Sequence, residues 1–275
     1  MIALYCLNRS PRLVSFIIPT VDKTDLLEQC LDSIINVCML NNASGIKHEI
    51  LVVQDGISPG ITNKLKALCK RFHCHFLQTG RFSGYTSAIN LGLQYSKGDL
   101  LVLLNDDVRF EQKEWLDLII KSLQLHPQAG LAGCRLLYPD RRIQYGGMFY
   151  SDDFQLLRHK FQGCPESEPD AQRVIRTVAL TGAVLAVKRE VYSQIGPLDQ
   201  RFVILCSDTD YCLTAHMKGW YVLYNGKAYA IHMESQTRKQ FAELKQLSKI
   251  EYRDKLLFYN KWSGQLKQMH MRGMI

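Results

Sequence analysis

Short apolar runs alternate with segments of helical spacing through the first half of the chain. The apolar runs are rich in Leu, Ile and Val and lie at residues 13–19, 49–53, 75–77 and 99–104. The segments between them place apolar residues three or four positions apart, as in helices packed on one side, and lie at 24–40, 61–72 and 82–95. This alternation predicts an α/β domain with a mostly parallel central sheet flanked by helices on both faces.

The second half of the chain is less regular. Its predicted strands lie at residues 131–139, 142–149, 178–187, 220–224 and 227–232. A helix is predicted over 208–218 and is closed by Gly219. The polar, proline-containing segment 152–171 is predicted to be a loop.

The C-terminal residues 238–275 differ from the rest of the chain in charge. They hold nine Lys or Arg against three Asp or Glu, so +6 of the formal net charge of +8 lies there and +2 lies in residues 1–237. A helix is predicted to begin near Thr237, where Gln240 completes a capping box. Its apolar residues recur every three positions: Phe241, Leu244, Leu247 and Ile250. Such a basic amphipathic helix can dock on the domain, or it can be drawn to an anionic membrane surface.

Composition excludes several classes of protein. The 275 residues are 47% hydrophobic and 22% charged, which is near the average for globular chains and unlike disordered or fibrous ones. No apolar run approaches the roughly 20 residues that span a bilayer, and the first residues lack the features of a signal peptide. Nine cysteines without a C-x-x-C pair indicate reduced thiols, so a cytoplasmic chain is expected. No nucleic-acid-binding module accompanies the basic charge, so nucleic acid is not an expected partner.

Polar residues follow three of the predicted strands, where ligands bind in open α/β sheets. Thr20 follows Pro19 at the end of the first strand, Asp55 follows the second, and Asp106 and Asp107 follow the run at 99–104. Two adjacent carboxylates repel each other unless a cation or hydrogen-bond donors compensate them, and Mg²⁺ or Mn²⁺ suits such a pair. The alternative is that these acids only cap the following helices.

Two further residues are candidates for chemistry. Asp208 lies at the start of a predicted helix, where it either caps the helix or acts as a general base toward an attacking hydroxyl. His232 ends the last predicted strand, and a histidine there is either structural or a metal ligand. Local sequence alone leaves both pairs of alternatives open.

Seven segments in order resemble the family 2 glycosyltransferases of the GT-A fold, and in particular their rhamnosyltransferase-like branch. The segments are VSFIIPT, EILVVQDG, GYTSAINLGL, LLVLLNDD, TGAVLAVKREVYSQIGPLDQRF, SDTDYCLTAHMKGW and AYAIH, and they span roughly residues 13–235. The resemblance implies a Rossmann-like GT-A domain over 1–237, with a nucleotide-binding half at about 13–110 and an acceptor and catalytic half at about 111–237. Residues 238–275 then form a basic amphipathic helical tail.

The resemblance also implies a function. It predicts an inverting enzyme that moves a sugar from a nucleotide-diphosphate sugar, UDP- or dTDP-linked, to a hydroxyl of a glycan or lipid-linked acceptor in cell-surface polysaccharide synthesis. The implied roles are nucleotide-sugar binding for Pro19, Thr20, Asp55 and Asp106, binding of a divalent cation, Mg²⁺ or Mn²⁺, for Asp107 and His232, and general base for Asp208. A homodimer and peripheral attachment to the inner face of a membrane are left open as further interactions.

Four positions depart from the family pattern, and one of them is Phe82, where relatives often have Asn. Asn105 replaces the first Asp of a D-x-D element, and Gln54 stands where many relatives have Asp. Ser207 replaces the Glu that usually precedes the base, which removes one negative charge beside Asp208. The alternative function is therefore a weakly active or inactive sugar-nucleotide-binding relative with a regulatory role.

Overall fold

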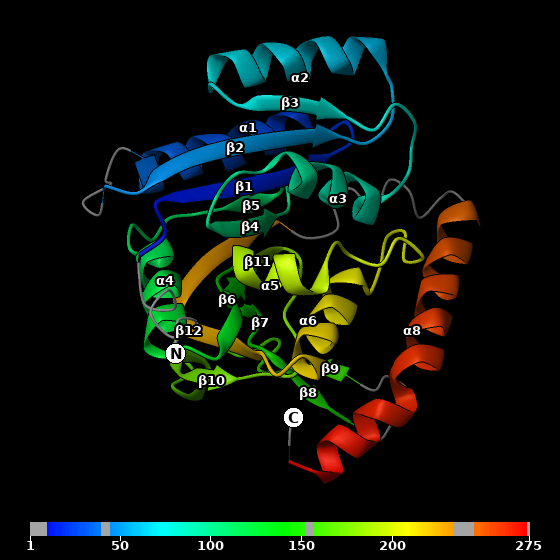
Figure 1. Cartoon of the computed structure of the whole chain (residues 1–275). Helices are drawn as coiled ribbons and strands as arrows, with labels where there is room; N and C mark the ends of the chain where they lie inside the picture. The colour runs from blue at the N-terminus through cyan, green and yellow to red at the C-terminus, as the bar shows by residue number, and fades with distance from the viewer. Residues whose placement is uncertain (1–9, 40–44, 152–156, 234–244, 274–275) are drawn as a thin grey trace.

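The computed structural model describes residues 10–39, 45–151, 157–233 and 245–273, and a ten-stranded sheet forms its centre (Figure 1). The path through eight of these strands is β10-β12-β6-β11-β4-β1-β2-β3, with β5 paired to β12 and β7 paired to β6. The strands are β1 (Leu13–Thr20), β2 (Lys47–Gln54), β3 (His75–Gln78), β4 (Leu100–Leu104), β5 (Val108–Arg109), β6 (Ala129–Leu137), β7 (Ile143–Tyr145), β10 (Val174–Arg176), β11 (Val184–Lys188) and β12 (Tyr221–His232). A separate two-stranded antiparallel sheet consists of β8 (Met148–Tyr150) and β9 (Leu157–His159).

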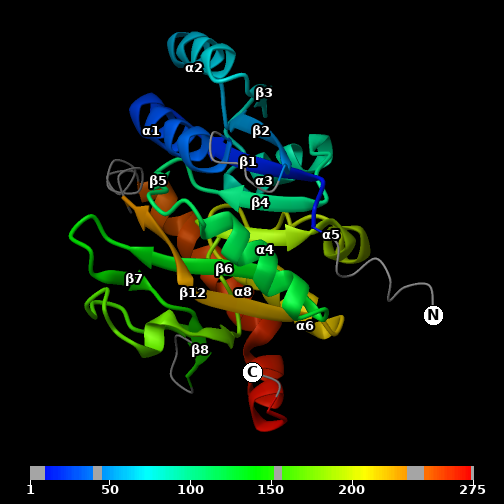
Figure 2. The ribbon, with the colours of Figure 1, turned by 90° about the vertical axis from the view of Figure 1, so that its left-hand side faces the viewer.

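The first half of the sheet is parallel, as the sequence predicts. β1 pairs in parallel with both β2 and β4, and β2 pairs in parallel with β3. All five residues of β4 are buried because helices cover both faces. Figure 2 shows α1 (Thr24–Ile34) and α2 (Pro59–Arg71) on one side of these strands and α3 (Tyr85–Tyr95) on the other. A π-helical turn, η1 (Ile35–Met39), extends α1. The α/β class with helices on both faces is therefore confirmed.

The second half of the sheet is mixed. β11 is antiparallel to both β4 and β6, whereas β12 is parallel to β6. Its helices are α4 (Trp115–Leu125), α5 (Arg189–Ile195) and α6 (Ser207–Met217), and a 3₁₀ turn, η2 (Asp170–Gln172), precedes β10. Parallel pairing therefore dominates only the half that carries the first βα units.

Several predicted boundaries in the second half were wrong. The predicted strand 178–187 is a strand only from Val184 onward, and residues 178–183 form a turn whose Thr181 and Gly182 reach a cavity. The two predicted strands at 220–224 and 227–232 are one strand, β12, with a register shift between Asn225 and Tyr229. The predicted strand 142–149 is divided between β7 and β8, and the predicted loop 152–171 contains β9. Burial produces apolar runs in turns as well as in strands, so hydrophobicity alone did not separate them.

The C-terminal helix α8 (Lys245–Met271) packs alongside α6 (Figure 1). Its buried apolar residues are Phe258, Trp262, Leu266 and Met269, which form a core with Val178, Phe202 and Leu213. The predicted helix start at Thr237 and Gln240, and the apolar positions 241 and 244, lie outside the described residues. The buried apolar positions of α8 are 258, 262, 266 and 269, spaced four, four and three residues apart. They lie later in the helix than the predicted apolar positions 247 and 250. The division of the chain at residue 237 stays a prediction.

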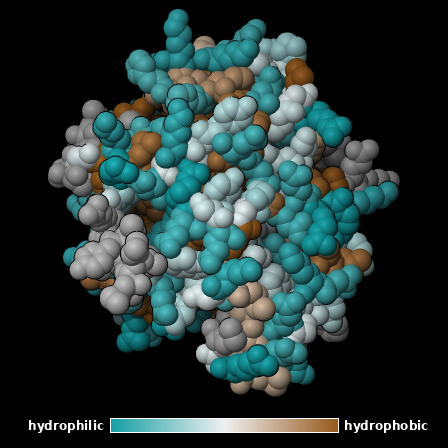
Figure 3. Space-filling view, in the orientation of Figure 1, coloured by the Kyte–Doolittle hydropathy of each residue, from teal (hydrophilic) through white to brown (hydrophobic). Residues whose placement is uncertain are grey.

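The face in Figure 3 is largely hydrophilic, with small separate hydrophobic patches. Within the described ranges, no helix combines the length and the hydrophobicity needed to cross a bilayer.

Candidate functional site

A cavity of about 440 Å³ lies at the carboxyl ends of β1, β2 and β4 and beside the start of α6. All seven residues predicted to form the site line it: Pro19, Thr20, Asp55, Asp106, Asp107, Asp208 and His232. Parallel strands end at the same edge of the sheet, which is why segments so far apart in the sequence meet here. The structure thus brings the predicted residues together, and their individual roles stay predictions.

Asp55 is a buried carboxylate that organises the loop before α3. Its Oδ1 accepts hydrogen bonds from the backbone N–H of Ser83 and the hydroxyl of Thr79, both at 2.9 Å. Its Oδ2 accepts the backbone N–H of Gly84 at 2.8 Å. Asp55 therefore fixes the shape of residues 79–84, and its predicted contact with the nucleotide would be added to this structural role.

The adjacent acids Asp106 and Asp107 are both about nine-tenths buried. Burial, followed by the negative charge of Asp107, raises the pKa of Asp106 to about 7. The two acids do not cap the next helix, because α4 has Glu114 at its N-cap position. A buried pair of this kind is stabilised by a proton or by a cation.

His232 is oriented by a residue that the sequence did not single out. Gln144 donates from Nε2 to the backbone carbonyl of His232 at 3.4 Å, which turns its Oε1 toward the ring, 2.7 Å from Nδ1. The Nδ1 atom therefore carries the proton, and in the neutral ring Nε2 presents a lone pair. That atom lies 3.0 Å from Oδ1 of Asp107 and 3.3 Å from the side-chain nitrogen of Asn105. Gln144 lies in β7 without any distinctive sequence pattern, so no local signal could have identified it.

This donor set fits a divalent cation whose shell is completed by a ligand. Within the part of the chain that the structure describes, no group of three His, Cys, Asp or Glu side chains could hold a metal ion. Asp107 Oδ1 and His232 Nε2 converge as two donors, and the hydrogen bond from His232 to Gln144 is typical of the outer partner of a metal-bound histidine. Mg²⁺ and Mn²⁺ commonly take few protein ligands, together with water and substrate phosphates.

Asp208 is held by hydrogen bonds from two sides. Its Oδ2 accepts the backbone N–H of Gly182 at 2.6 Å, and its Oδ1 accepts the backbone N–H of Thr209 at 2.7 Å. The N-cap residue of α6 is Cys206, in a left-handed conformation with φ of 67°, so Asp208 is not the cap. The structure therefore excludes the alternative that Asp208 is the N-cap of α6.

Two residues missed by sequence reasoning support this arrangement. A Cβ atom at Gly182 would lie 2.3 Å from the hydroxyl oxygen of Tyr85, so a side chain there would displace Tyr85. The Tyr85 hydroxyl donates to the carbonyl of Gly182 at 3.2 Å. Burial, and then the charge of Asp208, raise the pKa of Tyr85, which keeps it a neutral donor. Both residues lie in segments with clear motifs, GYT and TGA, that could have drawn attention to them.

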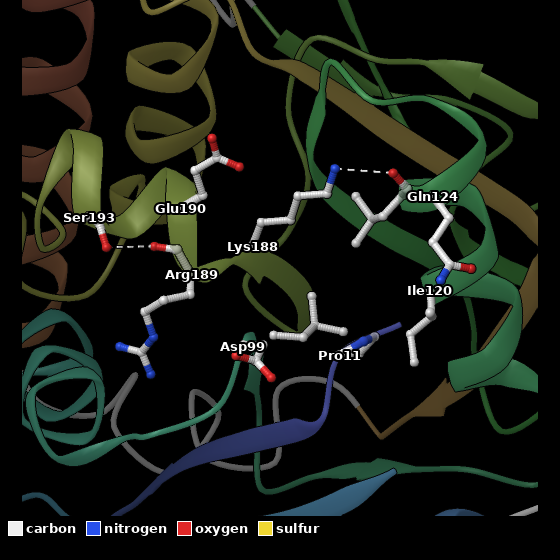
Figure 4. A pocket seen from close by; sticks show the side chains of 10 residues that line it. Pro11, Asp99, Ile120, Gln124, Lys188, Arg189, Glu190 and Ser193 are labelled. Atoms are coloured by element: carbon white, nitrogen blue, oxygen red, sulfur yellow. Dashed lines mark hydrogen bonds between the residues drawn. The ribbon is translucent and has the colours of Figure 1, made fainter. Parts of the chain in front are cut away.

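A second cavity of about 390 Å³ lies between α4, α5 and the start of β4 (Figure 4). Three of its charged groups are engaged within the fold. Asp99 Oδ2 accepts the backbone N–H of Arg12 at 2.8 Å, Lys188 Nζ donates to the carbonyl of Leu123 at 3.1 Å, and Arg189 Nε donates to the carbonyl of Gly98 at 2.9 Å. This cavity lacks the converging acids of the first one, so the first is the candidate site.

A family model described as glycosyl transferase family 2 matches residues 15–196 of the chain. The chain belongs to this family. The resemblance read from the sequence segments is confirmed, and the family match covers Asp55, Asp106 and Asp107. It ends before Asp208 and His232, so the interpretation of those two residues depends on their geometry in the cavity.

Two longer proteins are similar in sequence. The chain is 25% identical over 273 residues to the O-antigen biosynthesis protein RfbC of Myxococcus xanthus, which covers 94% of this chain and 20% of that protein. It is 28% identical over 244 residues to the uncharacterized protein y4gI of Sinorhizobium fredii (strain NBRC 101917 / NGR234), covering 86% and 26%. The chain thus spans about a fifth to a quarter of the length of these relatives.

Two solved structures share the fold. The mannosyltransferase PcManGT from Pyrobaculum calidifontis, in complex with GDP-Man and Mn²⁺, aligns with a TM-score of 0.59 and 16% identity, covering 82% of this chain and 58% of that one. GalNAc-T7 with UDP, GalNAc and Mn²⁺ aligns with a TM-score of 0.65 and 15% identity, covering 80% and 43%. The GT-A fold is therefore confirmed.

Proposed function

We propose that this chain transfers a sugar from a nucleotide-diphosphate sugar, UDP- or dTDP-linked, to a hydroxyl of a glycan or lipid-linked acceptor, with inversion, in polysaccharide synthesis. The observation that carries the proposal is the convergence of seven residues from five separate places in the chain, four of them carboxylates, on one cavity. Membership of glycosyl transferase family 2 supports the type of reaction. The relative named for O-antigen biosynthesis supports the polysaccharide, and the nucleotides in the two similar structures support the donor class.

The proposed mechanism assigns one task to each group in the cavity. Asp107 and His232 would hold a divalent cation, which when bound offsets the negative charge that develops on the departing diphosphate. Pro19, Thr20 and Asp55 would contact the nucleobase and ribose, with Asp106 beside the ribose. Asp208 would accept the proton of the acceptor hydroxyl as its oxygen forms the new bond to the anomeric carbon and the bond to the diphosphate breaks. A single displacement of this kind inverts the anomeric configuration.

A donor screen tests this proposal directly. The chain is mixed with UDP-, dTDP- and GDP-sugars in Mn²⁺, in Mg²⁺ or in EDTA, and its thermal unfolding is recorded. A ligand present at a hundred times its Kd should stabilise the folded state by about 2.7 kcal/mol, and the stabilisation should require the cation. A stabilising donor is then tested for release of its nucleoside diphosphate and, by NMR, for the anomeric configuration of the product. If no sugar nucleotide stabilises the chain, the proposal is wrong.

The second candidate, a weak or inactive relative with a regulatory role, is favoured by one observation. Ser207, buried beside Asp208, lines the cavity without the charge that many relatives carry there. This candidate predicts that a sugar nucleotide binds without release of nucleoside diphosphate. This candidate would be supported if a Ser207→Glu variant released nucleoside diphosphate from a donor that the natural chain binds without turnover.

We infer further that α8 attaches the enzyme to an anionic membrane surface, which suits a lipid-linked acceptor. Three apolar side chains on its outer side, Tyr252, Leu256 and Tyr259, are 69%, 47% and 44% exposed and follow one another at helical spacing. The exposed residues Lys249 and Lys255 lie on the same helix, and each basic residue near such a surface contributes about 1 kcal/mol.

Vesicle binding tests the membrane proposal. A variant with Tyr252, Leu256 and Tyr259 changed to Ser should lose sedimentation with phosphatidylserine vesicles. The control is Leu125→Ser, which removes an apolar residue that is 67% exposed from α4. Equal sedimentation of the variant and the natural chain contradicts the proposal. If the triple variant instead turns a dimer into a monomer in size-exclusion chromatography, the outer face of α8 joins two copies of the chain.

A further inference from the structure

A fully buried carboxylate on α8 holds the loop that leads into Asp208. Oδ2 of Asp254 accepts three consecutive backbone N–H groups, from Val203 at 3.0 Å, Ile204 at 2.8 Å and Leu205 at 3.0 Å. Asp254 is completely shielded from solvent, and its Oδ1 is paired with the guanidinium of Arg253 at 3.1 Å. Successive N–H groups that point to one spot form an anion-binding concavity, and here the anion is a side chain of the same protein.

The loop at residues 203–206 is part of the candidate site. Ile204, Leu205 and Cys206 line the same cavity as Asp208, only a few residues before it. Because Cys206 has a left-handed conformation, which is uncommon for a residue with a side chain, the path of the loop into α6 is a specific one that the surroundings must maintain.

The opposite side of this loop packs against the start of α3. A Cβ atom at Gly84 would lie 2.4 Å from the carbonyl oxygen of Val203, so the two backbones approach as closely as a glycine permits. The backbone N–H of Thr86 donates to that carbonyl at 3.3 Å. The loop is therefore held between α3, on the donor side of the cavity, and Asp254 of α8.

A second contact from α8 reaches the residue two positions after Asp208. Asp210, also buried, accepts the indole N–H of Trp262 at 2.7 Å and is paired with Lys261 at 2.6 Å. Residues on both sides of Asp208 in the sequence are thus fixed by one helix. The family match ends at residue 196 and includes none of these contacts.

We propose that α8 shapes the active site and that its Asp254 is a positioning residue for Asp208. The hydrogen bonds from residues 203–205 to Asp254 set the start of α6, and with it the place of the Asp208 carboxylate relative to the acceptor hydroxyl. This inference rests on the proposed role of Asp208 as the base. A misplacement of about 1 Å can cost about 100-fold in rate, so the loss of these bonds should lower kcat strongly while donor affinity stays unchanged.

The test compares three variants of the full chain at a temperature well below the lowest unfolding midpoint. Asp254→Ala removes the acceptor, whereas Asp254→Asn keeps a carbonyl oxygen for the three N–H groups. Leu266→Ala is the matched control, because it removes a fully buried side chain of the same helix that belongs to the α8 core and makes none of these hydrogen bonds. Hydrogen exchange of the peptide covering residues 203–205, donor Kd and kcat are measured for each.

The expected results separate positioning from stability. In Asp254→Ala, the backbone amide hydrogens of residues 203–205 should exchange faster. Its kcat should fall about 100-fold, and its donor Kd should stay unchanged. Asp254→Asn should recover a large part of the kcat. Leu266→Ala should lower the unfolding midpoint yet keep both the slow exchange of residues 203–205 and the natural kcat.

Three results would overturn the inference. These are unchanged exchange in Asp254→Ala, an unchanged kcat despite faster exchange, and an equal loss of kcat in Leu266→Ala. If the natural chain transfers no sugar from any donor, the proposed function fails and this inference fails with it. An active natural chain with a fully active Asp254→Ala variant overturns the inference alone.

Discussion

The two cavities at opposite ends of β4 and β11 are similar in size and differ in what their charged groups do. The cavity at the carboxyl end of β4 measures about 440 Å³ and the one at its amino end about 390 Å³. At the amino end, Asp99 and Lys188 are satisfied by backbone groups of neighbouring elements. At the carboxyl end, the buried acids Asp106 and Asp107 lie side by side, and Nε2 of His232 lies 3.0 Å from Oδ1 of Asp107.

The difference teaches that volume does not identify a functional site in this fold. Asp99 and Lys188 each hold together two neighbouring elements of the fold, and among the described residues neither lies beside a second buried charge of the same sign. A buried pair of like charges is instead costly until a proton or a cation joins it. Binding of a cation can therefore relieve a repulsion between buried charges in the first cavity, whereas the described residues of the second cavity include no such buried pair.

The largest expected effect is on Asp208. Asp208→Asn keeps the size of the side chain but removes the group that accepts the acceptor proton, so kcat should fall about 10²- to 10⁴-fold while donor affinity stays unchanged. The control is Asp99→Asn in the other cavity, whose amide oxygen can still accept the N–H of Arg12, and which should keep full activity. Near-normal turnover of Asp208→Asn would remove Asp208 as the base.

The next effect concerns the pH dependence of stability in EDTA. Because the pKa of Asp106 is raised to about 7 by burial and by Asp107, the folded state holds a proton that the unfolded state has already lost above about pH 4. The free energy of unfolding should therefore fall as pH rises from about 4 to about 7, by as much as about 4 kcal/mol for this group. Asp106→Asn should remove that part of the decline.

Urea unfolding at pH 4.5 and pH 7.5 measures this difference. The comparison of the natural chain with Asp106→Asn cancels the contributions of the other titrating groups. If both proteins lose the same free energy of unfolding between the two pH values, Asp106 does not hold an extra proton in the folded state. The contrast in charge between the two cavities would then be wrong.

Removing one proposed metal donor should weaken cation binding. Asp107→Ala takes away one of two converging donors, and because the loss of even an outer partner of a ligand typically costs 10- to 100-fold, Mn²⁺ affinity should fall by about 100-fold or more. Titration of Mn²⁺ in the presence of a nucleoside diphosphate, followed by electron paramagnetic resonance, measures it. Asp99→Ala, at the other end of the same strand, is the control. Equal affinities in all three proteins would contradict the metal assignment.

The sequence predicted the first half of the molecule well because its strands are buried on both faces and their polar ends carry the site. The runs at 13–19 and 49–53 became β1 and β2, and all seven predicted site residues line one cavity. The turn at residues 178–183 was read as strand because it is as apolar as β11, which follows it.

The contacts that support the site could not be predicted in this way. Gln144 and Asp254 act on partners 88 and about 50 residues away in the chain, and both occur in segments without a motif. The partners of Asp254 are backbone N–H groups, which leave no trace in side-chain chemistry. Periodicity and motif order identify the groups that face the cavity, whereas the groups that hold them emerge only from the folded structure.

The smallest effect is expected at Lys188, in the second cavity. Its ammonium donates to the carbonyls of Leu123 at 3.1 Å and Pro127 at 3.4 Å, near the end of α4, although burial lowers its pKa. Lys188→Met keeps the length of the side chain and removes these bonds, so the protein should lose about 1–2 kcal/mol of unfolding free energy and keep its full transfer rate. Urea unfolding and a transfer assay on the same preparation measure both quantities. A stable variant with a clearly lower transfer rate would mean that the second cavity takes part in function, and the contrast drawn between the two ends of β4 would be wrong.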